Sequence, residues 1–319
     1  MWDVLAGFAV VWLIIAVGYL LGRFGVLKPE ARIVMSRTAF FVASPCLLFI
    51  TISGSPISEV IGPQFGVAAI SAFITLFMFL LLGRFLLRGR RFAEQMIAAQ
   101  SAAQVNGANL GFPIAAYVLG DVALAAPVVM FQLALFMPIM VASLDQATIG
   151  TTTTSSVRPS TTRSVLRRIL QTVGNPVILG SLLGLLFSWQ QWSVVGPVAE
   201  SVELLAGAAI PLLLLSFGLS LVGNYPLDKA AGRRRDVLLA TAVKLIVHPV
   251  LAYLVAVYLF DLDGLMLYAA VVMASLPTAQ NVLVTAVRYQ TGEVIARDTV
   301  LITTLLGIPS MVVVALLMT

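Results

Sequence analysis

Hydrophobic residues in this 319-residue chain gather in long runs that are separated by mostly short polar connections. Each run holds about 20 residues, which is the length that an α-helix needs to cross ~30 Å of hydrocarbon. The pattern therefore predicts an all-α integral membrane protein with ten transmembrane helices. The runs occupy residues 2–22, 33–53, 64–87, 95–118, 123–145, 169–189, 198–222, 237–260, 265–287 and 299–319.

The charge of the connections alternates from one loop to the next. Loops that follow an odd-numbered span carry Lys and Arg, whereas the other loops carry only acidic charges, at Glu59, Asp121, Asp261 and Asp263. Because basic loops stay in the cytoplasm, we expect both termini on the extracytoplasmic side of the cell (inner) membrane. The basic residues are Arg23, Lys28, Arg32, Arg88, Arg90, Arg91, Arg158, Arg163, Arg167, Arg168, Lys229, Arg233 to Arg235, Arg288 and Arg297.

The longest connection, residues 146–168, is rich in Thr and Ser and predicts a flexible cytoplasmic linker. It separates a first five-helix repeat, residues 1–145, from a second, residues 169–319. Because five is odd, the second half must enter the membrane from the opposite side, so homologous halves would form an inverted repeat. Three landmarks recur in the same span order. They are Gly18-x-x-x-Gly22 with Gly180-x-x-x-Gly184, Pro45 in "ASPCLLF" with Pro211 in "AIPLLLL", and Pro113 with Pro277.

Composition narrows the class further. The chain is 60% hydrophobic and 10% charged, with a mean hydropathy of +1.03, which is typical of a polytopic membrane protein. The first run is expected to be a retained span, because Asp3 precedes it where a signal peptide has basic residues. The single cysteine, Cys46, excludes an intrachain disulfide. The net charge of +5 is explained by the cytoplasmic loops, so no nucleic-acid partner is expected.

Two of the predicted spans contain residues that disfavour a continuous helix. "VNGANLGFPIAAY" (residues 105–117) interrupts span 4, and "SLPTAQN" (residues 275–281) interrupts span 9. Paired interruptions in the two halves of a transporter indicate its binding site. We expect each helix to break at its proline and to restart just past it, so that two positive helix ends meet near the midplane and hold an anion. The predicted site residues are Asn106, Asn109, Gly111, Pro113, Pro277, Thr278, Gln280 and Asn281.

Two basic side chains lie inside span 8. Lys244 and His248 are one helical turn apart, and an ionisable residue within a membrane is a candidate for gating or coupling. Lys244 could instead extend to the interface, and His248 could be a packing residue. No Asp or Glu falls in the middle of a span, which argues against coupling through a buried carboxylate. Phosphate-binding loops, zinc patterns and nucleophile elbows are absent, so we expect no enzyme activity, no cofactor and no metal site.

Four stretches resemble the auxin efflux carrier family of bacterial and plant membrane transporters. They are "GYLLGRFGVLKPEAR" leading to "ASPCLLF", "NGANLGFPIA", "VKLIVHPVLA" and "SLPTAQNVLVTAVRY". The resemblance covers the whole chain in order. It implies a fold similar to bile-acid symporters and Na⁺/H⁺ antiporters, in which the broken helices 4 and 9 cross at their prolines. A scaffold domain of helices 1, 2, 6 and 7 and a transport domain of helices 3–5 and 8–10 would then move against each other.

The resemblance also implies substrates and residue roles. Family substrates are organic acids: auxin in plant members, and small carboxylates such as malate or malonate in bacterial ones. The asparagine that binds the substrate carboxylate carries over to Asn106, and more loosely to Asn281. Lys244 matches a lysine frequent in bacterial members, and a homodimer through the scaffold is consistent with the family. Ser36 departs from a frequent asparagine, so no role is carried over there, and the short linker indicates a bacterial-type protein.

These patterns together predict a secondary transporter of a small organic anion that works by alternating access. Its partners would be the lipid bilayer and an auxin-like acid or a mono- or dicarboxylate such as malate or malonate. Two alternatives stay open. One is a Na⁺- or H⁺-coupled symporter or antiporter of similar fold, and the other is a non-transporting membrane sensor.

Overall fold

The computed structural model describes residues 2–54, 62–87, 89–148, 176–222, 227 and 231–318. This part of the chain is helical, and the protein is a multi-pass membrane protein. Five of its helices are long and apolar enough to cross a membrane, and a sixth does so if Glu293–Gly307 and Pro309–Met318, bent by 47°, form one span. Shorter apolar helices lie at Ala9–Arg23, Gly107–Leu119, Pro176–Gln190 and Gly264–Ser275. Each of the ten predicted runs overlaps one of these long or short helices, and the overlap of the run 169–189 begins at Pro176.

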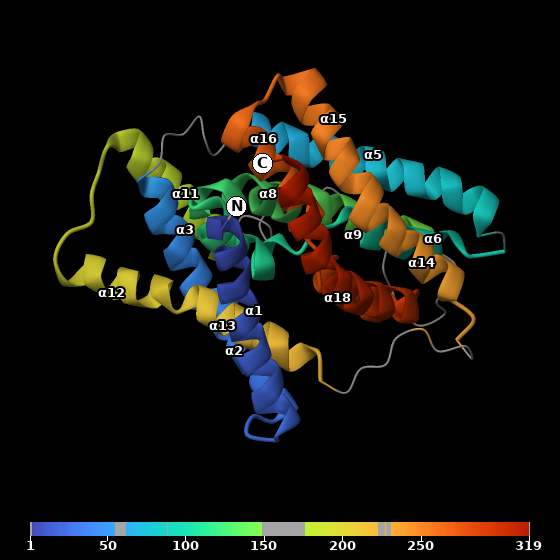
Figure 1. Ribbon diagram of the computed structural model, residues 1–319, viewed down its shortest axis with the longest axis horizontal. Helices are drawn as coiled ribbons and strands as arrows, with labels where there is room; N and C mark the ends of the chain where they lie inside the picture. Colours follow the sequence, from blue (N-terminus) through green and yellow to red (C-terminus); the bar gives the residue numbers. More distant parts are fainter. Residues whose placement is uncertain are drawn as a thin grey trace.

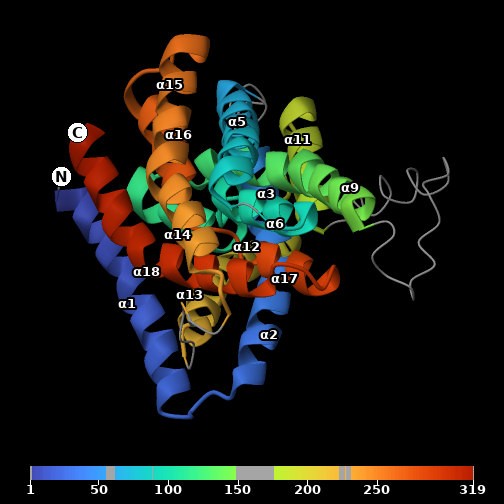
Figure 2. The same ribbon diagram turned by 90° about the vertical axis from the view of Figure 1, so that its right-hand side faces the viewer.

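The helices follow one another along the chain with several breaks inside the spans (Figure 1). The first half contains α1 (Trp2–Arg23), α2 (Pro29–Thr38), α3 (Ser44–Ser53), α5 (Pro63–Leu86), α6 (Phe92–Ala103), α7 (Phe112–Ile114), α8 (Ala126–Phe131) and α9 (Met137–Thr148). The second half contains α11 (Pro176–Gln190), α12 (Pro197–Gly207), α13 (Ala209–Ser220), α14 (Arg234–Ala242), α15 (His248–Phe260), α16 (Gly264–Ser275), α17 (Asn281–Arg288) and α18 (Glu293–Met318). The first and last helices bring the two ends of the chain close together (Figures 1 and 2).

Four prolines inside the spans are each preceded by a π-helical turn. A proline has no N–H and clashes with the carbonyl four residues before it, and a wider π-helical turn relieves both problems. Here each proline follows a five-residue π-helical turn by two residues. The pairs are Ala39–Ala43 with Pro45, Gly107–Gly111 with Pro113, Gln132–Phe136 with Pro138, and Val243–Val247 with Pro249.

The π-helical turn before Pro113 corrects the prediction of where span 4 breaks. We expected span 4 to break at Pro113, but Pro113 lies inside the helical segment Gly107–Leu119. The break falls earlier, at residues 104–106, between the end of α6 and Gly107. In span 9 the break does include the proline, because α16 ends at Ser275 and α17 begins at Asn281. The new helix ends are therefore at Gly107 and Asn281.

Two helix pairs, α1 with α13 and α3 with α11, pack at very short range (Figure 1). A Cβ atom on Gly18 of α1 would lie 2.4 Å from the carbonyl oxygen of Leu215 in α13. A Cβ atom on Gly180 of α11 would lie 2.4 Å from the carbonyl oxygen of Pro45 in α3. Only glycine permits this approach of two backbones, as in the small-residue interfaces of membrane helices.

The remaining long helices form a second group in which α5 packs on α6 and α15, and α14 on α18. Ion pairs tie its basic ends together. The guanidinium of Arg90 donates to both carboxylate oxygens of Asp236, at 3.0 and 2.9 Å, and this hydrogen bonding raises the pKa of Arg90. Arg233 donates to Glu94 at 2.8 Å. The loop before α6 and the start of α14 are thereby fixed to each other.

Gly180→Ala should destabilise the protein by about 1–3 kcal/mol, because the new methyl group must push two backbones apart. Gly207→Ala is the matched control, since no atom lies within 4 Å of its Cβ position. Thermal unfolding in detergent measures both variants. Equal unfolding temperatures for the two would contradict the close contact between α11 and α3.

Candidate functional site: the crossing of spans 4 and 9

The unwound parts of spans 4 and 9 cross and pair with each other. The N–H of Asn106 donates to the carbonyl of Pro277 at 2.8 Å, and the N–H of Ala279 donates to the carbonyl of Gln104 at 3.1 Å. Between them Val105 and Thr278 form an antiparallel β-bridge. Backbone groups released from a helix cost several kcal/mol each in a membrane unless they find partners. The two breaks therefore satisfy part of each other's backbone hydrogen bonding.

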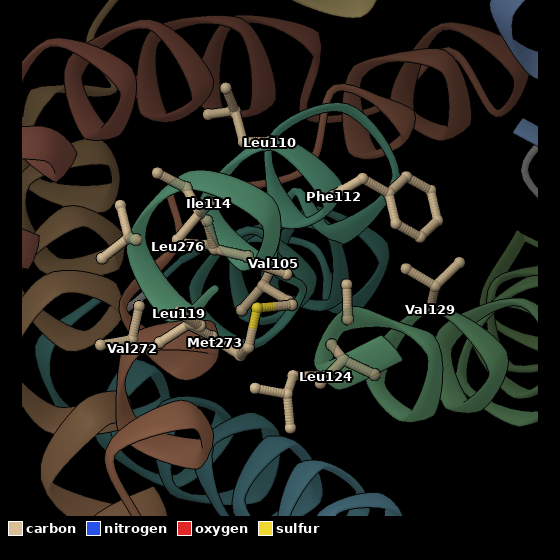
Figure 3. Close-up of a cluster of buried hydrophobic side chains, with 14 of the residues drawn as sticks. Val105, Leu110, Phe112, Ile114, Leu119, Leu124, Val129, Val272, Met273 and Leu276 are labelled. Atoms are coloured by element: carbon tan, nitrogen blue, oxygen red, sulfur yellow. The ribbon is translucent and has the colours of Figure 1, made fainter. Parts of the chain in front are cut away.

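Hydrophobic side chains cover one side of the crossing (Figure 3). They come from spans 4, 5 and 9 and are almost completely buried. Such a shell keeps water away from the backbone bonds and strengthens any electrostatic contact made beside them. The side chains labelled in Figure 3 are Val105, Leu110, Phe112, Ile114, Leu119, Leu124, Val129, Val272, Met273 and Leu276.

Asn106 occupies the position where span 4 becomes helical again. Its backbone oxygen accepts from the N–H groups of Leu110 and Gly111, at 3.0 and 3.2 Å. Its side chain is 2% exposed, and the amide nitrogen Nδ2 has no hydrogen-bond partner among the described residues. A buried N–H donor without a partner costs about 1–3 kcal/mol. The main chain of Asn106 thus holds the crossing, while its amide remains available to another group.

A narrow pocket opens beside this amide. Its volume is about 20 Å³, which is room for one water molecule. It is lined from span 4 by Gln104, Val105, Asn106, Ala108 and Asn109, from span 5 by Val129, Gln132 and Leu133, and from span 9 by Ala279 and Asn281. The polar groups that meet here are uncharged amides.

The structure separates the eight predicted site residues into three groups. Asn106, Asn109 and Asn281 line the pocket together. Pro277 and Thr278 hold the crossing, since Thr278 also donates through its hydroxyl to the carbonyl of Ser101 at 2.6 Å. The remaining three lie elsewhere: Gly111 and Pro113 are buried within the helix of span 4, and Gln280 lies on the other side of span 9.

Three glutamines that are not among the predicted site residues belong to the same region. Gln104 and Gln132 line the pocket. Gln100 donates to Gln104 at 2.8 Å, and its own oxygen has no partner in the described part of the chain. Their position inside predicted apolar spans could have marked them. Burying an amide there costs free energy unless the amide is hydrogen-bonded or serves a function.

Lys244 and His248 form a buried pair. Nζ of Lys244 lies 2.7 Å from Nδ1 of His248 and donates to the carbonyl of Ala274 at 3.0 Å. Both side chains are at most 2% exposed, so Lys244 does not extend to the interface. Ala274 lies in the last turn of α16, where a cation is favoured by the helix dipole. On its other side His248 Nε2 is 3.5 Å from the hydroxyl of Ser71.

Ser36, the residue that departs from the family pattern, has a packing role. Its hydroxyl lies 2.9 Å from the hydroxyl of Ser216, which also lies 3.2 Å from the carbonyl of Arg32. These contacts join α2 to α13. Within the described ranges no group of three or more His, Cys, Asp or Glu side chains is arranged to hold a metal ion.

Comparison with known proteins decides the family. The family model described as "Membrane transport protein" matches residues 4–315. The chain belongs to this family, the auxin efflux carriers. It is a membrane transporter and not an enzyme, and the resemblance seen in the sequence is confirmed.

Similar proteins in this family come from bacteria, archaea and plants. A protein of Rhizobium meliloti named "Putative malonate transporter" is 27% identical over 92% of this chain and 89% of its own length. An "Uncharacterized transporter" of Methanocaldococcus jannaschii is 24% identical over 92% of each chain. "Auxin efflux carrier component 1" of Arabidopsis thaliana is 30% identical over 50% of this chain and 26% of its own length.

Proposed function

We propose that this carrier is a secondary transporter of a small organic anion and that the substrate carboxylate binds at the crossing of spans 4 and 9. The observation that carries the proposal is the unpartnered amide of Asn106. It lies where the helix of span 4 restarts, beside Asn109 and Asn281. An N–H donor that is already desolvated gains a charge-assisted hydrogen bond when a carboxylate arrives.

The electrostatics of the pocket favour an anion over a cation. Two helix segments begin at its wall, at Gly107 and at Asn281, and each N-terminus carries roughly half a positive charge. The lining contains neither Asp nor Glu among the described residues, so nothing there neutralises this potential. Amide donors and helix ends together can bind a carboxylate without an arginine in the pocket.

The substrate class follows from the size of the site and from a relative. The pocket of about 20 Å³ must widen to admit a carboxylate, so we propose small acids such as malonate or malate ahead of larger auxin-like acids. The name of the Rhizobium meliloti relative, "Putative malonate transporter", makes malonate the first substrate to test. Widening of a closed central pocket is also what alternating access requires.

An inverted repeat would give two domains that move against each other, each built from helices of both halves. It is supported by the reciprocal packing of the glycine pairs, because span 1 (Gly18) rests on span 7 and span 6 (Gly180) rests on span 2. We propose repeats at residues 1–145 and 169–319, joined by the linker 146–168, most of which lies outside the described residues.

Spans 1, 2, 6 and 7 would form the scaffold domain, which would also provide the surface for a homodimer. The other spans would form the transport domain. Basic loops would face the cytoplasm and both termini the outside.

A proton-coupled version of this function is supported by the Lys244–His248 pair. Two cations cannot share a separation of 2.7 Å in a buried site without strong repulsion, so the pair holds fewer protons than its two groups could carry in water. A conformation that exposes the pair would let it take up a proton. Transport by this protein would then respond to an imposed pH gradient.

A thermal-shift screen tests the proposed function directly. Malonate, malate and indole acetate should each be added to the purified protein, with and without Na⁺ and across a pH series. A carboxylate at 100 times its Kd should stabilise the folded state by about 2.7 kcal/mol. Malonamide, which has the shape of malonate without the charge, is the control. If no carboxylate raises the unfolding temperature above the malonamide value, the proposal fails.

A further inference from the structure

A second and larger pocket lies on the opposite side of the span 9 break. Its volume is about 140 Å³, which is room for roughly five water molecules or for one small dicarboxylate. Helices α2, α13, α17 and α18 and the residues next to them form its walls. The polar residues that line it are Arg32, Ser220, Gln280, Arg297 and Thr304.

The two arginines of this pocket differ in how their charge is balanced. Arg297 donates from Nε to the carboxylate of Asp298 at 2.8 Å. Arg32 donates from Nη2 to the neutral oxygen of Gln280 at 3.1 Å, and among the described residues it has no carboxylate partner. Arg32, on α2, is partly buried. A partly desolvated guanidinium without a counter-ion favours the binding of an anion.

A further donor lines the same pocket. Thr304 is 4% exposed, and its hydroxyl has no hydrogen-bond partner in the described part of the chain. It lies on α18, whereas Arg32 lies on α2. The pocket therefore joins an unneutralised cation to an unpartnered hydroxyl, and a carboxylate could bond to both.

The pocket adjoins the crossing through one short segment. Ala279 and Asn281 line the central pocket, whereas Gln280, between them, lines the larger one. Gln280 also occupies the N-cap position of α17, and its side-chain oxygen accepts from Arg32. A group that takes over the Nη2 donor of Arg32 would replace Gln280. The release of Gln280 would then act on the segment that holds the central pocket.

We propose that this larger pocket is a second anion site, which receives the substrate carboxylate at the face with the basic loops and passes it to the crossing. The assignment of a carboxylate rests on the proposed function. Arg32 exchanges its hydrogen bond to Gln280 for a charge-assisted one to the substrate. When the carboxylate moves on, Gln280 returns and closes the route behind it.

Thiol labelling tests the charge of the pocket without any substrate. Ser220→Cys in a Cys46→Ser background places a single thiol in its wall, and the protein is held in discs of neutral phosphatidylcholine. An anionic, sulfonate-bearing methanethiosulfonate is compared with a cationic, trimethylammonium-bearing one. Arg32→Gln should lower the anionic-to-cationic rate ratio by about tenfold or more, because the two reagents respond with opposite sign.

Arg37→Gln is the matched control, since Arg37 lies on the same helix but is exposed and does not line the pocket. It should leave the ratio within about twofold, because exposed charges are screened. Malonate should slow the labelling of the parent thiol and have no effect once Arg32 is Gln. An unreactive thiol, an unchanged ratio in Arg32→Gln, or labelling that malonate does not slow would overturn the proposal. Retained uptake by Asn106→Ala would instead refute the central site, without altering the labelling ratio.

Discussion

Asn106→Ala should lower carboxylate uptake into proteoliposomes by about ten- to hundredfold while the protein stays folded. The side-chain amide donates no hydrogen bond within the described protein, so its removal should cost the free carrier little stability. The backbone bonds of Asn106 at the crossing remain. Only the bound state loses a hydrogen bond to a charged group, which is worth about 1.5–3 kcal/mol. Initial rates of malonate uptake and the unfolding temperature measure the two effects separately.

Thr299→Val is the matched control for this experiment. Thr299 is as buried as Asn106 and its hydroxyl also lacks a partner among the described residues, but it does not line the pocket. It should therefore leave uptake unchanged. Asn106→Asp should be at least as inactive as the alanine variant, because a negative charge in the pocket repels the substrate. Wild-type uptake by Asn106→Ala would remove Asn106 from the site.

Lys244→Met is expected to abolish the response of uptake to an imposed pH gradient, with a loss of about tenfold or more in rate. The substitution removes the buried amino group of Lys244, which is the group that can gain or lose a proton. Stability should be retained. Methionine fills nearly the same volume, and the cost of burying a charge disappears, which offsets the loss of the bonds to Ala274 and His248.

The comparison for this variant is Lys28→Met, which removes the same charge from an exposed position and should transport normally. His248→Gln keeps a hydrogen-bond acceptor for Lys244 but removes the titrating ring, so it separates bonding from proton transfer. Gradient-driven uptake at the wild-type rate in Lys244→Met would show that the pair serves packing alone.

The positions of the spans could be predicted from the sequence because transfer into lipid depends on local composition. The ten apolar runs overlap the long and short apolar helices of the structure, and the family followed from short motifs around Pro45, Asn106, His248 and Pro277. The amide-rich interruptions also marked the unwound parts of spans 4 and 9, since burying an amide in an apolar span costs free energy unless it finds a partner. These features depend on which residues stand at neighbouring positions and not on contacts between distant segments.

The error at Pro113 shows where local reasoning stops. A proline was expected to break the helix, but the π-helical turn before it absorbs the clash, and the break moves to residues 104–106. What opens the helix there is the unwound segment of span 9: the N–H of Asn106 donates to the carbonyl of Pro277. No property of either segment alone specifies that pairing.

Neighbours in the sequence were also separated by the fold. Gln280 and Asn281 looked like parts of one site, yet Asn281 lines the central pocket and Gln280 meets Arg32 in another. Arg32 had been counted only as a loop charge that sets orientation. The sequence by itself determined that the chain crosses the membrane, which family it belongs to and which spans are interrupted, because those depend on composition and order. Only the tertiary structure decided which amide is free and which arginine lacks a counter-ion, because a hydrogen bond or an ion pair depends on what lies opposite.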